Sequence, residues 1–335
     1  MDIVVSGATG FIGYNLVQHL SQQGFKISGL IRNFHKVDLL TQWGVEPVLV
    51  DLQDTDKLKE AVRGAKVVFH LAALRGEGFW SWEEFYRVNV KGTENLLKAC
   101  LNQVNHFIYC SSVSVFGHFW PGPATENYPY APVNNYGRSK VEAEKLVFRY
   151  YQEKDLPVTI VRPVITYGPQ DVSGMLTKLI RLIYSGKYLT VGNGNNRVHL
   201  VYIDDLIQGF ERIMTQPRAV GEAFIIAGEK PITVNELVAK VAFILNKKVP
   251  PFHVPRSLAR GIGFCLEKIF AAGASTRLSF FKKEPLCTRS KVDIMTVDCS
   301  YSIEKARQLL GYQPRVPYDE GIRWTVEWLR TGRQL

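Results

Sequence analysis

The sequence predicts an α/β protein in which a doubly wound parallel sheet is followed by a smaller, mostly helical part. Short apolar runs of strand length alternate with segments of helical periodicity through the first half of the chain. Three glycines, at every third position, follow the first apolar run almost at once. The 335 residues, of which 46% are hydrophobic, are enough for a full core and a second unit.

The elements follow one another along the chain. Strands are predicted at residues 3–5, 25–31, 45–50, 66–71, 106–112 and 157–162. Helices are predicted at residues 14–21, 56–62, 82–102, 136–151, 176–185, 233–245 and 257–272. Apolar strands joined by helices are typical of a parallel sheet covered on both faces. The predicted division is a dinucleotide-binding domain of residues 1–165 with a returning segment at about 200–228, and a substrate-binding lid of residues 166–199 and 229–335.

The glycine-rich turn after the first strand indicates a Rossmann dinucleotide site. Gly7 allows the tight turn, Gly10 lets the backbone approach a pyrophosphate, and Gly13 lets the helix pack closely on the strand. The N-terminus of the helix that follows favours phosphate electrostatically. The spacing GxxGxxG differs from the GxGxxG of many dehydrogenases, and glycine turns also close ordinary strand–helix junctions. The residues expected at the cofactor from this turn are Gly7, Thr9, Gly10, Phe11, Ile12 and Gly13.

Arg32 follows the second strand, where an NAD site usually carries an acid that binds the ribose 2′-hydroxyl. A guanidinium there would pair with a 2′-phosphate, and His35 and Lys36 could add to the basic patch. We therefore expect NADP(H) rather than NAD(H) as the cofactor. The alternative is a solvated arginine in the loop at the end of the strand.

Tyr136 and Lys140 lie four residues apart and so share one face of a predicted helix. A free tyrosine has a pKa near ~10 and exchanges protons poorly at neutral pH, but an adjacent ammonium lowers that pKa. Such a tyrosine could exchange a proton with a carbonyl or alcohol oxygen. A tyrosine and a lysine at this spacing are also common on solvated helix faces, so the rest of the sequence has to decide between a catalytic pair and a surface pair. Ser112, at the carboxyl end of a predicted strand, lies at the sheet edge where ligands bind.

These segments together resemble an extended short-chain dehydrogenase/reductase. The stretches that carry the resemblance cover nearly the whole chain, in the family's order. They are Gly7–Gly13, Asp51-Leu52, Asn89-x-x-Gly92-Thr93, Ser111–Gly117, Tyr136-x-x-x-Lys140, Arg162-Pro163, Tyr167-Gly168-Pro169 and Val201–Leu206. Their joint occurrence is far more specific than any one of them.

The resemblance implies roles for individual residues. Tyr136 would be the general acid/base, Lys140 would lower its pKa and bind the nicotinamide ribose, and Ser112 would bind the substrate oxygen. Ser111 is the alternative if the strand register is shifted by one residue. Asn89 is expected to be structural, or to hold a water, rather than to take part directly. The further residues expected to line the cofactor are Asp51, Leu52, Leu71, Ala72, Ala73, Asn89, Pro163 and Val164.

The reaction is predicted by a comparison of branches within the resembled family. Dehydratases need carboxylates beside the serine, where this chain has Val113 and Ser114. Epimerases typically retain NAD, against which Arg32 argues. The segments 284–291 and 301–314 resemble the dihydroflavonol reductase and 3β-hydroxysteroid dehydrogenase branch, although its steroid members commonly use NAD. We expect an NADP(H)-dependent enzyme that transfers a hydride between nicotinamide and a ketone or alcohol.

Two alternatives stay open. One is a nucleotide-sugar epimerase with retained NAD. The other is a non-catalytic NADP-binding sensor, although the intact Ser112, Tyr136 and Lys140 argue against it.

The substrate is expected to be bulky and apolar, similar to a steroid, a flavonoid or a polyketide. Aromatic residues in loops near the strand ends, including Trp80 and Phe119, suggest this, although they could equally pack a lid. Arg197 resembles a position that contacts substrate phosphate in sugar-nucleotide enzymes; the alternative is a structural arginine. Residues 257–283 combine an apolar helix with aromatics and lysines, which suits either the wall of the pocket or contact with a membrane surface.

Composition limits the remaining classes. The net charge is +10, but the basic residues form no run of five, so no nucleic-acid groove is expected. The five cysteines show no metal-binding spacing, so we expect no metal site and reduced thiols in a cytoplasmic protein. No signal peptide and no transmembrane helix are predicted. The family resemblance also implies a homodimer formed through the helix that carries Tyr136.

Overall fold

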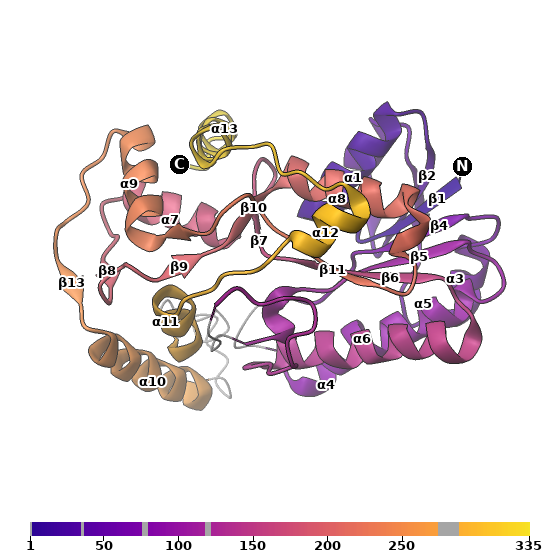
Figure 1. The fold of residues 1–335 in the computed structure, drawn as a ribbon, viewed down its shortest axis with the longest axis horizontal. Helices are drawn as coiled ribbons and strands as arrows, with labels where there is room; N and C mark the ends of the chain where they lie inside the picture. Colours follow the sequence, from indigo (N-terminus) through magenta and orange to yellow (C-terminus); the bar gives the residue numbers. More distant parts are fainter. Residues whose placement is uncertain (1, 35–36, 76–79, 118–121, 274–287) are drawn as a thin grey trace.

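The computed structural model describes residues 2–34, 37–75, 80–117, 122–273 and 288–335. Its centre is a seven-stranded sheet in the order β11-β6-β5-β4-β1-β2-β3, and every neighbouring pair is parallel (Figure 1). The strands are β1 (Asp2–Ser6), β2 (Lys26–Ile31), β3 (Glu46–Leu49), β4 (Val67–His70), β5 (His106–Cys110), β6 (Val158–Pro163) and β11 (Ala223–Ile226). The predicted doubly wound α/β fold is confirmed.

Alternate residues of each strand face two separate cores. Ile3 and Val5 of β1 belong to one apolar cluster, and Val4 belongs to the other. The first cluster includes α1 (Phe11–Gln22) and α8 (Ile203–Thr215), and the second includes α3 (Thr55–Ala61), α5 (Gly92–Cys100) and α6 (Asn135–Lys154). Both faces of the sheet are therefore covered by helices, which explains why the strands read as continuous apolar runs.

The helix predicted at 82–102 is not continuous. It consists of α4 (Trp82–Phe85), a π-helical stretch η2 (Tyr86–Lys91) and α5. Asn89 lies in the π-helical stretch, where its side chain binds the backbone of Leu74. Hydrophobic periodicity does not reveal a π turn, and such turns often occur at functional sites.

The second half of the chain builds three small two-stranded sheets beside the main one. β7 (Ile165–Tyr167) pairs with β10 (Leu200–Tyr202), β9 (Arg197–Val198) with β12 (Ile232–Thr233), and β13 (His253–Val254) with β8 (Thr190–Val191). Between them the chain returns to the main sheet through α8 and β11. The remaining helices are α2 (Asp38–Thr41), α7 (Met175–Tyr184), α9 (Val234–Leu245), α10 (Arg256–Gly273), α11 (Arg289–Thr296), α12 (Glu304–Leu310) and α13 (Tyr318–Thr331).

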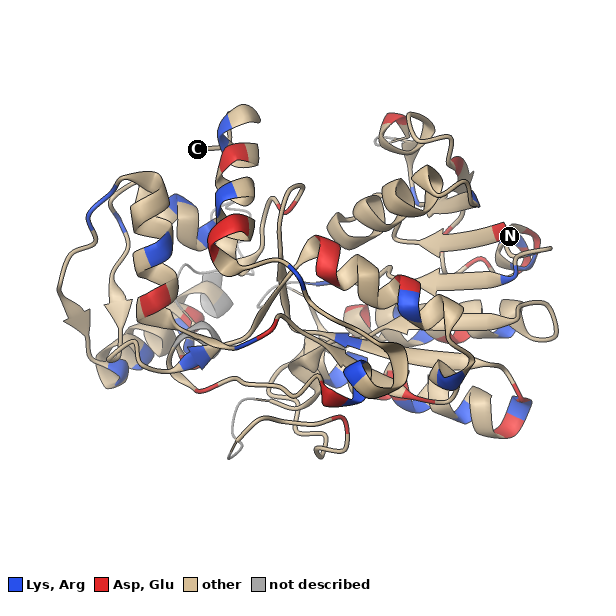
Figure 2. Cartoon of the chain, turned by 45° about the horizontal axis from the view of Figure 1, so that its top comes forward, with Lys and Arg blue, Asp and Glu red and all other residues tan. Residues whose placement is uncertain are grey.

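Charged residues of both signs are interspersed along the helices (Figure 2). Among the described residues, no helix combines the length and the apolar character needed to span a bilayer. Cys100, Cys110, Cys265 and Cys299 are free thiols, and Cys287 lies outside the described residues. No cluster of three metal-binding side chains occurs within the described ranges.

Candidate active site

The turn between β1 and α1 has the geometry of a phosphate-binding loop. Gly7 has a φ of +74°, and its carbonyl oxygen accepts a hydrogen bond from the Gly10 amide at 2.9 Å. A Cβ on Gly13 would lie 2.1 Å from that same oxygen, so only glycine fits there. No side chain caps α1, and its first turn carries no acid. The first amides of α1 are therefore free to bind anionic oxygens, and the loop fits a dinucleotide pyrophosphate.

The other residues expected at the cofactor lie at the carboxyl ends of the neighbouring strands. Leu71, Ala72 and Ala73 follow β4, and the Leu71 amide binds the Ser6 carbonyl at 3.1 Å. The carbonyl of Leu52, after β3, accepts a hydrogen bond from the Asn95 amide group at 2.9 Å. Asp51 precedes Leu52, and Pro163 is the last residue of β6, which Val164 follows. Because β1 and β4 are neighbours, the chain reverses its winding direction at this edge, where α/β folds bind ligands.

Arg32 directly follows β2 at this same edge, and its side chain is exposed. Within the described part of the chain it has no hydrogen-bond or ion-pair partner. The guanidinium is therefore free to bind an anionic group. His35 and Lys36 lie outside the described residues.

Tyr136 is placed by the start of α6. Asn134 caps the helix by accepting a hydrogen bond from the Gly137 amide at 2.8 Å. A Cβ on Gly137 would lie 2.6 Å from the carbonyl oxygen of Ser114. The glycine next to the tyrosine therefore lets α6 pack directly against the short helix η3 (Val113–Val115), which Ser112 precedes.

The phenol of Tyr136 and the hydroxyl of Ser112 form one polar group. Burial raises the pKa of Tyr136 to about 12, while the positive charge of Arg75 and a hydrogen bond with Ser112 act in the opposite direction. The Ser112 hydroxyl also accepts a hydrogen bond from the Ser114 amide at 3.1 Å. Ser111 is buried, and its hydroxyl has no partner among the described residues. Ser112 is thus the serine that reaches the tyrosine.

Lys140 lies one helical turn further along α6 and is 2% exposed. Its ammonium donates to the carbonyl of Cys110 at 2.8 Å and to the hydroxyl of Tyr109 at 3.3 Å, and it lies 5.9 Å from the centre of the Tyr136 ring. Burial lowers the pKa of Lys140 to about 8. Without cofactor, the net pKa of Tyr136 is raised and not lowered, because burial outweighs the nearby positive charge.

The side chain of Asn89 is hydrogen-bonded both to the loop after β4 and to helix α6. Its side chain accepts a hydrogen bond from the Leu74 amide at 2.7 Å and donates to the Leu74 carbonyl at 3.0 Å. It also donates to the Ser139 hydroxyl at 2.9 Å, and Ser139 in turn donates to the carbonyl of Tyr136 at 2.7 Å. The side chain of Asn89 therefore fixes the loop after β4 to helix α6.

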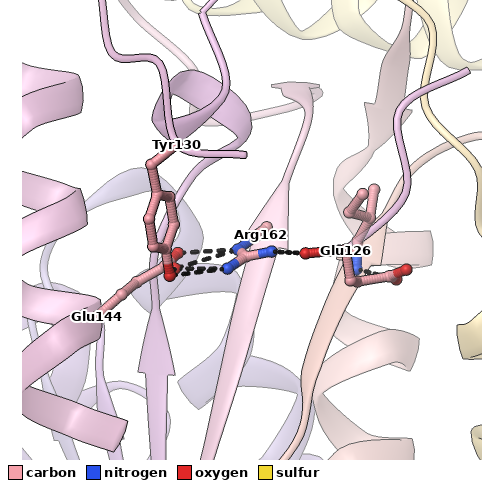
Figure 3. Close-up of polar contacts among 5 residues, drawn as sticks. Glu126, Tyr130, Glu144 and Arg162 are labelled. Carbon is pink, nitrogen blue, oxygen red and sulfur yellow. Dashed lines mark hydrogen bonds and ion pairs between the residues drawn. The ribbon is translucent and has the colours of Figure 1, made fainter. Parts of the chain in front are cut away.

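A buried ion pair holds the same helix against β6 (Figure 3). The guanidinium of Arg162 binds both carboxylate oxygens of Glu144, at 2.6 and 2.9 Å, and both side chains are almost completely buried. Tyr130 donates to Glu144 at 2.7 Å, and Arg162 donates to the Glu126 carbonyl at 2.8 Å. Helix α6, strand β6 and the loop of residues 122–131 are thereby joined.

The residues expected at the substrate are less closely tied to this site. Trp80 is 43% exposed. Arg197 lies on β9, and its guanidinium is 3.8 Å from the carboxylate of Asp298. Phe119 lies outside the described residues, as do residues 274–283 of the segment 257–283.

Arg75, Glu144 and Tyr109 are the site residues that motif spacing did not indicate. Arg75 comes two residues after Ala73, the last of the small residues at the end of β4. A cationic residue so close to the end of a strand, at the edge where ligands bind, is the sequence signal that could have indicated Arg75. Glu144 lies four residues after Lys140 and so falls on the same face of α6.

Comparison with known proteins agrees with this geometry. The model of the NAD dependent epimerase/dehydratase family matches residues 3–227, from the first strand to the end of β11. The chain is a member of the NAD dependent epimerase/dehydratase family. Its extended short-chain dehydrogenase/reductase character, expected from the motifs, is confirmed.

Relatives in this family differ in reaction. The chain is 30% identical over 306 residues to N-acetyl-alpha-D-glucosaminyl-diphospho-ditrans,octacis-undecaprenol 4-epimerase of Escherichia coli O157:H7, with 89% of each chain covered. It is 28% identical over 337 residues to 2-alkyl-3-oxoalkanoate reductase of Shewanella oneidensis, covering 95% of this chain and 84% of that protein. It is also 28% identical over 350 residues to 3beta-hydroxysteroid-dehydrogenase/decarboxylase isoform 1 of Arabidopsis thaliana, covering 97% and 78%.

The fold has close counterparts among solved structures. UDP-glucuronic acid 4-epimerase of Bacillus cereus, in complex with UDP-glucuronic acid and NAD, superposes with a TM-score of 0.79. The two chains are 24% identical, and 99% of each is covered. Membership of this family therefore indicates the fold and the dependence on a nicotinamide cofactor. It does not indicate the substrate, because the relatives act on different ones.

Proposed function

We propose that this protein is an NADP(H)-dependent oxidoreductase that transfers a hydride between nicotinamide and a ketone or alcohol of a bulky, mostly apolar substrate. The contact between Tyr136, whose pKa is raised to about 12, and Ser112 carries the proposal. A phenol with that pKa stays protonated at neutral pH, so Tyr136 holds the proton that reduction of a carbonyl requires. Positive charge beside the phenol has to lower this pKa for the transfer. The reductase and steroid dehydrogenase among the relatives support the substrate class.

The proposed mechanism assigns the proton to this chain and the hydride to the cofactor. The nicotinamide, when bound, supplies or accepts the hydride. Ser112 holds the substrate oxygen, and Tyr136 gives its hydroxyl proton to that oxygen as the carbonyl is reduced. Lys140, charged below its pKa of about 8, supplies positive charge beside the phenolate that remains. In the oxidative direction Tyr136 takes the proton from the alcohol.

The preference for NADP(H) is the second part of the proposal, and Arg32 supports it. An exposed guanidinium just after β2, with no partner among the residues that the structure describes, suits a 2′-phosphate, and the acid that an NAD site usually carries is missing at that position. Loss of a charge-assisted contact costs about 1.5–3 kcal/mol. We expect Arg32→Ala to raise the KM for NADPH by about 10- to 100-fold and to leave the KM for NADH unchanged. Equal effects on both cofactors would remove this assignment.

The proton-transfer role is tested with the purified chain, NADPH and a panel of ketones, by following loss of the NADPH absorbance. Tyr136→Phe should reduce kcat by at least about a thousandfold while NADPH binding, measured by fluorescence, stays unchanged. Tyr151→Phe, about four turns further along α6, is the matched control and should keep full activity. A Tyr136→Phe enzyme with more than a tenth of the wild-type kcat would refute the mechanism.

The epimerase relative gives a second candidate: 4-epimerisation of a sugar nucleotide or sugar–lipid diphosphate with retained NAD. The two candidates differ in how the cofactor is held. An epimerase oxidises its substrate with its own NAD, re-reduces the resulting keto intermediate, and carries tightly bound NAD through purification, whereas a reductase exchanges NADPH in each turnover. Denaturing the purified protein and identifying the released dinucleotide separates the two candidates.

A further inference from the structure

The geometry points to Arg75 as a binding subsite for an anionic oxygen group of the substrate, a carboxylate or a phosphate, next to the carbon at which Tyr136 acts. This inference rests on the proposed function, because it places the anion relative to the carbon that is reduced or oxidised. It adds a specificity residue that the motifs of the family do not include.

The backbone just before Arg75 is held by a chain of hydrogen bonds that ends at the backbone carbonyl of Tyr136. Asn89 fixes both the amide and the carbonyl of Leu74, the residue just before Arg75. The same side chain continues to Ser139, which donates to the carbonyl of Tyr136. Asn89 is 1% exposed and Ser139 is fully buried, so this connection has little freedom. The start of the Arg75 side chain is therefore fixed relative to Tyr136.

The positive charge of Arg75 acts on titratable groups from two parts of the site. Burial raises the pKa of Tyr136 and of Asp171, in the loop after β7, and lowers the pKa of Lys140; the positive charge of Arg75 acts to lower all three. Arg75 is therefore close enough to act on groups of helix α6 and of the loop of residues 168–174. It follows β4 by five residues, at the sheet edge where α/β folds bind ligands.

This cation has no partner within the described part of the chain. Arg75 is exposed and takes part in no hydrogen bond or ion pair there. The Asp171 carboxylate, whose pKa the charge of Arg75 acts to lower, is already bound by the Gly174 amide at 2.8 Å and by the Thr177 hydroxyl at 3.3 Å. A guanidinium beside a half-buried catalytic site gains most from a carboxylate or phosphate, which it can bind through two parallel hydrogen bonds.

The substrate class that follows is a ketone or alcohol with an oxyacid group close to the reacting carbon. The simplest probe is a 3-oxo acid compared with its neutral ester, because the two differ only in the charge that Arg75 would bind. We would measure KM and kcat with NADPH for 3-oxododecanoate and for methyl 3-oxododecanoate. The variants are Arg75→Gln, Arg75→Lys and, as a control, Arg87→Gln, an exposed arginine on η2.

We expect Arg75→Gln to raise the KM for the acid by about 10- to 100-fold while the KM for the ester and for NADPH stays unchanged. Arg75→Lys should recover part of the loss, since it keeps the charge but not the paired donors. Arg87→Gln should have no effect. Equal losses for acid and ester would show a structural role for Arg75 and overturn the inference, as would a change confined to the KM for NADPH.

A binding measurement separates failure of this inference from failure of the proposed function. If neither ketone is turned over, the reductase assignment fails, and titration calorimetry of NADP⁺-saturated protein with decanoate, decyl phosphate and decanol tests the subsite directly. Anion binding that Arg75→Gln weakens at least about tenfold supports it, and the stronger of the two anions identifies the oxyacid. Absent anion binding, or binding that the variant leaves unchanged, overturns it.

Discussion

Replacing Glu144 with glutamine should destabilise the whole domain, because it leaves the Arg162 guanidinium buried without its counter-charge. The side chains of Arg162 and Glu144 are 3% and 0% exposed, and two nitrogens of Arg162 bind the carboxylate. A glutamine would keep one acceptor oxygen but turn an NH2 group toward the guanidinium. Removing one partner of such a pair costs about 3–5 kcal/mol, a large part of the ~5–15 kcal/mol that typically stabilises a folded protein.

The measurement is urea unfolding followed by circular dichroism, with Glu142→Gln as the matched control on the same helix. Glu142 pairs with Lys145 at 3.1 Å, but their side chains are 41% and 53% exposed, so its loss should cost no more than about 0.5 kcal/mol. If Glu144→Gln comes within about 1 kcal/mol of this control, then burial does not control the strength of the pair and the reasoning fails.

Three further predictions concern the site and its surroundings. Gly137→Ala should lower kcat by about a hundredfold, because the new methyl group would meet the Ser114 carbonyl at 2.6 Å and displace Tyr136; Gly261→Ala, with nothing within 4 Å, should be silent. The value of kcat/KM for reduction should fall as pH rises above about 8, because Lys140 loses its charge there, and a profile flat to pH 10 would contradict this assignment. Acid should destabilise the fold between pH 6.5 and about 4, since buried His106 and His199 have pKa values lowered to about 4 and stay neutral while the unfolded chain binds protons; urea midpoints at pH 7 and 5 measure this, and equal midpoints would refute it.

The predicted elements agree with the structure wherever a local pattern governs them. The strand predicted at 25–31 is found as Lys26–Ile31, and the helix predicted at 136–151 begins one residue earlier and ends three residues later. The helix predicted at 82–102 is the exception, because the π turn at Asn89 follows from a contact with Leu74 and not from periodicity.

The features of the candidate site also divide into those that local motifs predict and those that depend on packing. Ser112, Tyr136 and Lys140 were predicted from motifs, and the structure brings Ser112 against the Tyr136 phenol. The direction of the net pKa shift of Tyr136 was not predictable, because burial of the phenol depends on how α6 packs against η3.

The sequence by itself determined the sheet, the glycine-rich turn and the candidate residues for proton transfer, because each depends on neighbours within a few positions or on a known order of motifs. Only the tertiary structure decided what surrounds Tyr136. Arg75 comes from a loop 61 residues earlier in the chain, and Arg162 holds α6 from a strand that follows it. Burial and charge act through space, so spacing along the chain does not reveal them.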